Sequence, residues 1–260
     1  MTIACIINDY YDSPLTNNAI KSVLGLVDSI IVVNSVKPYD KINDDSIIYL
    51  NLKESDVGKR YIYGLNTIIA DYYFLLDYDD TFEINKINYA IKELTKWPVL
   101  KENDKYDNKM TLIDNVIINH IDWHISKYSF NDYFKNYLIN FIEVNKVDTS
   151  ASFDKILFSV MLAFGFYKIT KEKLTNKINH NDSKMHLISK KLFYSKTFDI
   201  FTNLANNNAY YNTMFINYVW YNIFLNKFLC NRSKESYKVL INEFEIPLRK
   251  KLYYKSIIKR

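Results

Sequence analysis

The sequence predicts an α/β fold: a mostly parallel sheet with helices on both faces, followed by a C-terminal helical extension. Two observations carry this prediction. A strand at residues 3–7, a helix, and a second strand at residues 30–33 succeed one another, which is the order of a parallel βαβ unit. The unbroken apolar run at residues 72–76 is typical of a strand that is buried on both faces, as in a parallel sheet covered by helices.

The first helix is predicted to begin after Ser13 and Pro14, because a hydroxyl residue caps a helix and proline fits its first turn. The strand at residues 30–33 follows, and residues 47–50 form a third strand. The apolar face of the first helix consists of Leu15, Ala19, Ile20, Val23, Leu24 and Val27.

A cluster of acidic residues follows the apolar run at residues 72–76. In open α/β sheets ligands bind beyond the carboxyl ends of the strands, so Asp77, Asp79 and Asp80 come at the place where a ligand is expected. If the chain stays extended, Asp77 and Asp79 lie on the same side. Two carboxylates without His or Cys nearby suit Mn²⁺ or Mg²⁺ shared with a phosphate-bearing substrate. A basic loop at Lys59 and Arg60, and a helical stretch with Ile62, Leu65, Ile68 and Ile69 at helical spacing, precede that run.

After the acidic cluster, the chain continues with helices and at least one more strand. A helix is predicted at residues 84–94 and is closed by Pro98, and a charged loop follows at residues 101–109. Residues 110–118 alternate as a half-buried strand does, and residues 130–142 and 153–164 have helical periodicity, with Gly165 ending the second helix. His120 and His124 have the spacing of a zinc site, but no third ligand accompanies them.

Composition narrows the function classes. The chain has 260 residues and only four glycines, so glycine-rich backbone cradles for phosphate are not expected, and a bound phosphate needs a metal ion or Lys and Arg side chains. Two cysteines and the lack of a secretory signal favour a cytoplasmic, reducing setting. The net charge of +5 permits an anionic substrate without demanding nucleic acid, and no nucleic-acid partner is expected.

Residues 64–80, GLNTIIADYYFLLDYDD, resemble the "G…GL…A.G.YI.FLD.DD" pattern of the family-2-type nucleotide-sugar glycosyltransferases. This resemblance implies a GT-A (Rossmann-like) fold and the metal-dependent transfer of a sugar from a nucleoside diphosphate donor to an acceptor hydroxyl, with inversion. Asp77 and Asp79 would bind Mn²⁺ or Mg²⁺. The residues that match the pattern are Gly64, Leu65, Ala70, Asp71, Tyr72, Tyr73, Leu76, Asp77, Asp79 and Asp80.

The resemblance also implies a donor-binding site at the ends of the first strands. Asn8 replaces the proline of the family's first motif and Tyr11 replaces its asparagine, whereas Tyr10 is kept. Asn34 and Ser35 stand where the family places an acidic pair that holds the nucleoside, so the base preference is open. The implied donor-binding set is Asn8, Asp9, Tyr10, Asn34, Lys59, Arg60 and Asp77.

Two further positions match the family beyond the acidic cluster. Counting back from Gly165 places Asp154 on the family's catalytic base, with Phe153 in place of a glutamate. The alternative for Asp154 is a carboxylate favoured by the helix dipole alone. His180 resembles the His of the family's "H-x-x-S" segment, which holds the diphosphate or its metal. The resemblance covers residues 1–195, so the transferase core is predicted at 1–195 and a separate helical extension at 196–260.

Two other functions stay open at this point. Asp77 and Asp79, followed by Thr81, also fit the D-x-D-x-T motif of haloacid-dehalogenase-type phosphatases, with Asp77 as nucleophile. The departures at Asn34 and Phe153 allow a non-catalytic protein that only binds nucleotide-sugar.

The extension is predicted to be helical without crossing a membrane. Residues 209–230 are rich in aromatic side chains, but asparagines point in several directions around the helix, which is too polar for a lipid-spanning segment. Residues 248–260 predict a basic amphipathic helix that either lies on an anionic membrane or packs back on the domain. Membrane binding would bring the site to a lipid-linked acceptor; a glycan or a protein acceptor is the alternative.

Overall fold

The structure is a computed structural model that describes residues 1–9, 13–34, 41–52, 54–103, 124–177, 190–207 and 213–243, together with residues 255 and 258. The chain forms two compact units. The first comprises residues 1–104, 122–144 and 149–179, and the second comprises residues 105–121, 145–148 and 180–260. The division predicted at residue 195 stays a prediction, and residue 195 lies within a helix of the second unit.

A seven-stranded sheet in the order β3-β2-β1-β4-β7-β6-β8 forms the centre of the first unit. Only β7 runs antiparallel to its neighbours β4 and β6, so the predicted mostly parallel α/β sheet is confirmed. The strands are β1 (Ile3–Asp9), β2 (Ser29–Asn34), β3 (Ile47–Asn51), β4 (Tyr72–Asp77), β6 (Val99–Glu102), β7 (Tyr128–Asn131) and β8 (Lys168–Thr170).

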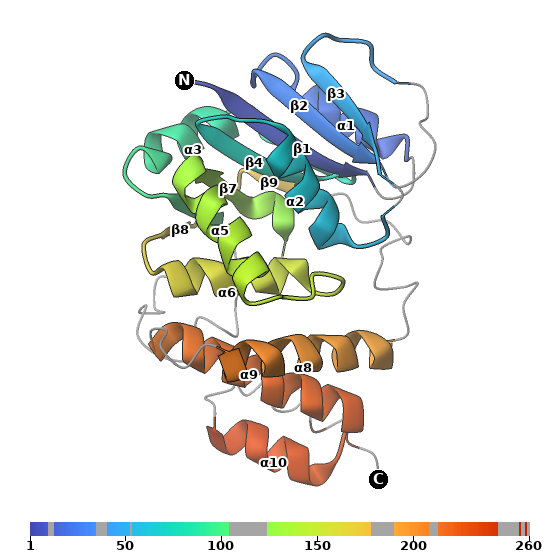
Figure 1. The fold of residues 1–260 in the computed structure, drawn as a ribbon, viewed down its shortest axis with the longest axis vertical. Coiled ribbons are helices and arrows are strands. Elements are labelled where there is room, and N and C mark those ends of the chain that lie inside the picture. Colours follow the sequence, from blue (N-terminus) through green and yellow to red (C-terminus); the bar gives the residue numbers. More distant parts are fainter. Residues whose placement is uncertain are drawn as a thin grey trace. The chain divides into compact units, whose positions relative to one another are not determined.

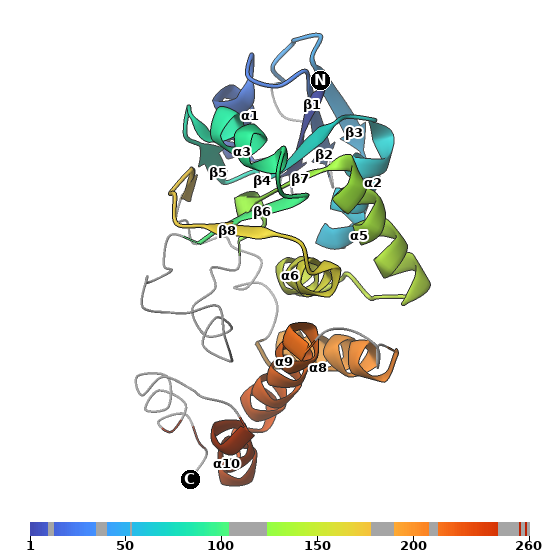
Figure 2. The same ribbon diagram turned by 90° about the vertical axis from the view of Figure 1, so that its left-hand side faces the viewer.

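Helices cover both faces of this sheet (Figures 1 and 2). Helices α1 (Leu15–Val23) and α3 (Lys86–Leu94) bury their apolar sides against one face, with Cys5 of β1 and Phe74 of β4 among the core residues. Helices α2 (Val57–Thr67) and α5 (Asp132–Val144) cover the other face. Gly64 permits the close approach of α2, because a Cβ there would lie 2.5 Å from Ile6 Cγ2.

Three smaller elements of the first unit surround the carboxyl end of β4. Strands β5 (Asp80–Phe82) and β9 (Thr175–Lys177) pair as a two-stranded antiparallel sheet, and Asp80 lies opposite Lys177. The 3₁₀ helix η1 (Ile125–Lys127) leads directly into β7. Helix α6 (Phe153–Phe164) follows α5 and ends at Gly165, as predicted, with a φ of 80° at that glycine.

Most described residues of the second unit after residue 189 are helical, as the predicted C-terminal extension requires. It contains α8 (Lys190–Asn207), α9 (Thr213–Asn231) and α10 (Lys234–Glu243). Phe201 of α8 packs edge-to-face on Tyr218 of α9, with ring centroids 5.8 Å apart. Among the described residues, no helix is long and apolar enough to cross a membrane.

The structure corrects two predicted elements. The sequence predicts Phe130 in the helix at 130–142, but this residue belongs to strand β7, and α5 begins only at Asp132. The spacing of the aromatic residues around Phe130 fits the period of a helix as well as that of a strand. In the structure, Phe130 pairs with Tyr73 of β4, so this segment is a strand. Lys101, predicted in a charged loop, lies in β6, fully buried, with its Nζ 4.7 Å from the centroid of the Tyr128 ring.

Other differences concern the ends of elements. The first helix ends at Val23, before the predicted Leu24 and Val27, and the helix predicted from residue 84 begins at Lys86. Ile69 lies beyond α2 and is exposed. The strand predicted at 110–118 lies outside the described residues, as does the basic segment 248–260 apart from residues 255 and 258.

Candidate active site

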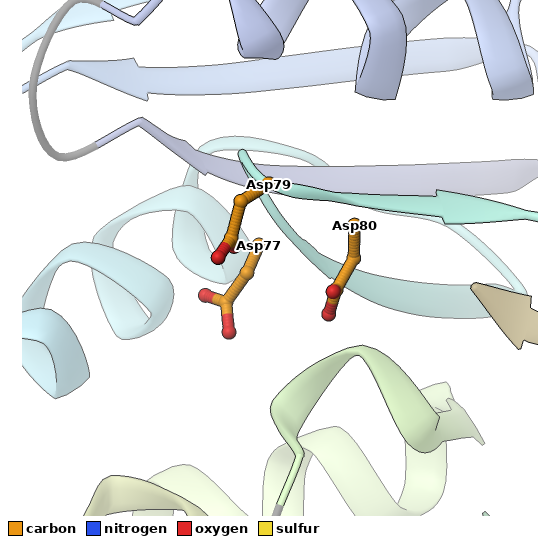
Figure 3. Close-up of side chains that lie close together, drawn as sticks. All are labelled: Asp77, Asp79 and Asp80. Atoms are coloured by element: carbon orange, nitrogen blue, oxygen red, sulfur yellow. The ribbon is translucent and has the colours of Figure 1, made fainter. Parts of the chain in front are cut away.

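Three carboxylates gather where β4 ends. Asp77 is the last residue of β4, Asp79 lies in the turn after it, and Asp80 opens β5. Figure 3 shows the three side chains directed toward the same space. One oxygen from each of them lies within 4.8 Å of the others, a spacing at which the three side chains can share one cation. The structure thus brings together the predicted pair, Asp77 and Asp79, and adds a third residue.

The sequence places Asp80 beside the expected ligand site but does not predict it as a metal ligand. Period-two alternation sends its side chain away from Asp77, but the turn at residues 78–79 re-aims it toward the cluster. Asp80 is 2% exposed. Its Oδ1 is buried without a hydrogen-bond partner among the described residues, and the same holds for Oδ1 of neighbouring Asn8. Buried oxygens of this kind are expected to meet a partner, and a divalent cation is a partner that suits them. The donor set therefore fits Mn²⁺ or Mg²⁺.

The cluster carries strongly perturbed carboxyl groups. Burial and the charge of Asp79 raise the pKa of Asp77 to about 6, although hydrogen bonds from Tyr61 and Asn8 act in the opposite direction. The Tyr61 hydroxyl donates to Asp77 Oδ1 at 2.7 Å. Burial and the charge of Asp77 raise the pKa of Asp80 to about 7. The neighbouring carboxylates raise the pKa values of Asp77 and Asp80 because like charges at short range disfavour ionisation.

These shifts predict a stability that depends on pH and on divalent cations. An Asp in the unfolded chain has a pKa of about 3.9. The folded-state pKa values are about 6 for Asp77 and about 7 for Asp80. At a pH between the unfolded-state and folded-state values, the folded protein therefore binds more protons than the unfolded chain, and its stability is lost as the pH rises toward 7. In EDTA, we expect the thermal unfolding midpoint to decrease as the pH is raised from 5 to 8. Mg²⁺ should raise it at pH 8 and have little effect at pH 5.

Asp80→Asn is the matched variant for this prediction. It removes the group with the higher of the two printed pKa values, so its midpoint in EDTA should depend less on pH than that of the wild type. The prediction is contradicted if the wild-type midpoint rises from pH 5 to pH 8, or if Asp80→Asn has the same pH dependence as the wild type. Either result would show that ionisation of the cluster does not destabilise the folded protein.

Helix α2 connects the cluster to the start of α6. Asp56 caps α2 by accepting from Lys59 N at 3.1 Å, and its carboxylate also accepts from Thr149 Oγ1. Tyr61, which bonds Asp77, stacks on Phe153 with ring centroids 5.9 Å apart. Phe153, a departure from the family pattern, therefore packs against the tyrosine that orients Asp77.

Asp154 lies in the first turn of α6, next to Phe153. It is half-buried, and burial raises the pKa of its carboxyl, while Lys155 and backbone N–H groups act in the opposite direction. Its charge also contributes to the raised pKa of Asp77, so the two carboxylates lie within electrostatic reach of each other. A carboxylate with a raised pKa is a better general base than an exposed one.

Gly58 sets the distance between α2 and the segment that leads to Asp154. A Cβ at this position would lie 2.7 Å from Phe153 Cδ2 and 2.9 Å from the Thr149 carbonyl oxygen. We expect Gly58→Ala to displace this segment and to lower turnover by about 100-fold, the order expected for a misplacement of about 1 Å. The rate per folded molecule and the thermal midpoint are measured together.

Gly25→Ala is the control for that variant. Gly25 has a φ of 76° and no atom within 4 Å of an added Cβ, so alanine there costs stability through its backbone conformation alone. Equal losses of turnover per folded molecule in Gly25→Ala and Gly58→Ala would contradict a specific role for Gly58.

The remaining predicted donor-binding residues have diverse environments. Asp9 is fully buried, its Oδ1 accepts from Ser13 N at 3.3 Å, and its carbonyl oxygen accepts from Nη1 of the fully buried Arg60 at 3.0 Å. Lys59 is exposed, with its Nζ 3.6 Å from Glu54 Oε2. Asn34 is the last residue of β2, in register with Asp9.

Two predicted site residues, Tyr10 and His180, lie outside the described residues, as does His120 of the considered zinc pair. His124 precedes η1, and its Nε2 lies 3.3 Å from Lys177 Nζ. Lys177 in turn lies opposite Asp80 and lowers the pKa of that carboxyl. Sequence reasoning missed Lys177, because only the β5–β9 pairing brings it to the cluster.

Comparisons with known proteins give matches at the level of structure. A scan against protein-family models and a search of curated proteins both find no match. Among solved structures, residues 1–349 of S. aureus TarS match with a TM-score of 0.60 and 13% identity, over 96% of this chain and 77% of that one.

TarS structures with bound ligands match in the same way. The complex with UDP-GlcNAc has a TM-score of 0.59 and 12% identity, over 99% of this chain and 79% of that one. The complex with UDP has a TM-score of 0.59 and 13% identity, over 98% of this chain and 78% of that one. At such low identity the similarity shows the fold, which is Rossmann-like and of the GT-A type.

Proposed function

We propose that this protein is a metal-dependent glycosyltransferase that moves a sugar from a nucleoside diphosphate donor to an acceptor hydroxyl, with inversion at the anomeric carbon. The observation that carries the proposal is the Asp77, Asp79 and Asp80 cluster at the carboxyl end of β4, with Asp154 within electrostatic reach of it. This is the edge at which open α/β sheets bind ligands. The resemblance of residues 64–80 to nucleotide-sugar transferases supports the same reading.

In the proposed reaction, Asp77, Asp79 and Asp80 would hold Mn²⁺ or Mg²⁺. The bound cation supplies Lewis-acid stabilisation of the charge that develops on the leaving diphosphate. Tyr61 and Asn8 orient Asp77 through their hydrogen bonds. His180 is proposed as a further ligand of the metal or the diphosphate, on the resemblance alone.

Asp154 is proposed as the general base. It takes the proton of the acceptor hydroxyl while that oxygen forms its bond to the anomeric carbon. The bond between the anomeric carbon and the diphosphate oxygen breaks, and the diphosphate leaves with the electron pair. Because attack and departure occur on opposite sides of the carbon, the configuration inverts.

The donor-binding set is proposed to include Asn8, Asp9, Tyr10, Asn34, Lys59, Arg60 and Asp77. UDP-sugars are the first donors to test, since TarS, which shares the fold, has been solved with UDP and with UDP-GlcNAc. The acceptor is proposed to be a glycan, a lipid-linked molecule or a protein. A cytoplasmic protein whose segment 248–260 lies on an anionic membrane would reach a lipid-linked acceptor.

A donor screen tests the proposal. The protein is incubated with Mn²⁺, a panel of nucleoside diphosphate sugars and simple acceptors, and release of nucleoside diphosphate is measured. We expect release with at least one donor and loss of release in EDTA. Binding without release for every donor would favour a non-catalytic binding protein. Phosphate release from phosphate monoesters, without any use of nucleotide-sugar, would favour the phosphatase alternative.

A further inference from the structure

A buried residue of η1, Ser126, contacts the segment that carries the carboxylate cluster. Ser126 is fully buried at the centre of this short 3₁₀ helix. Its Oγ accepts from the backbone N–H of Asp77 at 2.9 Å. The same hydroxyl lies close enough to the Asp80 side chain to lower the pKa of that carboxyl. One hydroxyl therefore joins the end of β4 to the start of β5, across the turn that carries Asp79.

The backbone of Ser126 is itself fixed by a buried ion pair. Lys86 Nζ donates to the Ser126 carbonyl oxygen at 2.6 Å and lies 2.5 Å from Glu102 Oε1. Thr175 Oγ1 accepts from Lys86 Nζ at 2.7 Å and lies 3.0 Å from Glu102 Oε1. Both charged side chains are almost fully buried, at 0% and 2% exposed. A paired, hydrogen-bonded buried charge is costly to disrupt, so the position of η1 is well defined.

We infer that Ser126 is a positioning residue of the metal centre, which helps to set the relative orientation of Asp77 and Asp80 for the cation. This inference rests on the proposed function, because it assumes that the cluster binds a divalent cation. Groups that orient the ligands of a metal contribute to its affinity, and losing one typically weakens binding by about 10-fold to 100-fold. The Ser126 hydroxyl contacts the backbone of Asp77, so it would act on the cation through the carboxylates.

Ser126→Ala removes the hydroxyl and leaves the carboxylates in place. The dissociation constant for Mn²⁺ alone is measured from the EPR signal of free Mn²⁺ during titration. We expect it to rise about 10-fold or more. In turnover assays, the Mn²⁺ concentration for half-maximal rate should rise by a similar factor, while kcat at saturating Mn²⁺ changes little. A loss of folded structure alone would not separate these two quantities in this way.

Ser159→Ala is the matched control. Ser159 is as buried as Ser126, and its hydroxyl donates to the Lys155 carbonyl oxygen within α6, so the same atom is removed from a different place. Ser126→Cys keeps the shape of the side chain, with a somewhat larger atom, while replacing the hydroxyl with a weakly hydrogen-bonding thiol, and it serves if Ser126→Ala does not fold. We expect weaker Mn²⁺ binding in both Ser126 variants and wild-type binding in Ser159→Ala.

Two results would overturn the inference, and they are distinguishable. If the wild type binds Mn²⁺ and the Ser126 variants bind it equally well, or no more weakly than Ser159→Ala, then Ser126 does not position the centre, and the proposed function is untouched. If the wild type itself binds no Mn²⁺, the metal centre of the proposed function fails, and the role of Ser126 fails with it.

Discussion

Replacing Asp79 by alanine is expected to lower turnover by at least about 100-fold, since removing one group that stabilises developing charge costs about 10²–10³ in kcat. Asp79 lies in the turn between β4 and β5, and its oxygen lies within 4.8 Å of those of Asp77 and Asp80. Without it, two carboxylates remain to hold the cation, and Mn²⁺ should no longer stimulate the reaction. Release of nucleoside diphosphate is measured across a series of Mn²⁺ concentrations.

Asp71→Ala is the control for Asp79→Ala. Asp71 precedes β4 at the opposite end of the strand, where it accepts from Thr2 N at 2.6 Å on the surface. Its loss is expected to affect stability and to leave the response to Mn²⁺ unchanged. If Asp79→Ala keeps wild-type turnover and the wild-type response to Mn²⁺, the cluster is an acidic turn without a metal.

Replacing Asp154 by asparagine is expected to lower turnover by about 10²–10⁴-fold while leaving donor affinity nearly unchanged. Asparagine keeps the size of the side chain but cannot take the proton of the acceptor hydroxyl. The neighbouring contacts of Phe153 and Thr149 do not involve the carboxylate, so the start of α6 should stay in place. Single-turnover rates and the affinity for UDP are measured on the same preparation.

Asp132→Asn separates catalysis from a helix-dipole effect. Asp132 also lies in the first turn of a helix, α5, but at the end of the sheet away from the cluster, where its backbone N–H donates to the Asp71 carbonyl oxygen. Both variants lose a favourable interaction with a helix N-terminus, which is worth about 0.3–1 kcal/mol. Only Asp154→Asn should lose turnover. If Asp154→Asn transfers sugar at the wild-type rate, Asp154 is not the general base.

The parallel half of the sheet was predictable because its strands are short, apolar and separated by turn residues. Tyr72–Asp77 is buried through its length except at its ends, and it delivers Asp77 to the edge where the sequence pattern placed it. The antiparallel strand β7 was missed, because the aromatic residues from Phe130 onward fit a helix as well as a strand. Its assignment depends on pairing with β4 and β6, which the local sequence does not contain.

The site was predictable only as far as neighbours in the sequence define it. Asp77 and Asp79 share one turn, whereas Asp80 joins them through a change of direction that alternation does not foresee. Lys177 and Ser126 reach the cluster from segments about 100 and 50 residues away, by strand pairing and by hydrogen bonds to Lys86. Such contacts depend on the folded topology, so a single sequence does not reveal them.

The metal dependence of UDP binding tests the proposed centre most directly. UDP is titrated into the protein by calorimetry, once with Mn²⁺ and once with EDTA, and the titrations are repeated with Asp79→Ala. We expect tight binding only for the wild type with Mn²⁺, because the cation links the carboxylates to the diphosphate. Identical curves for the wild type in Mn²⁺ and in EDTA would contradict a metal centre at Asp77, Asp79 and Asp80.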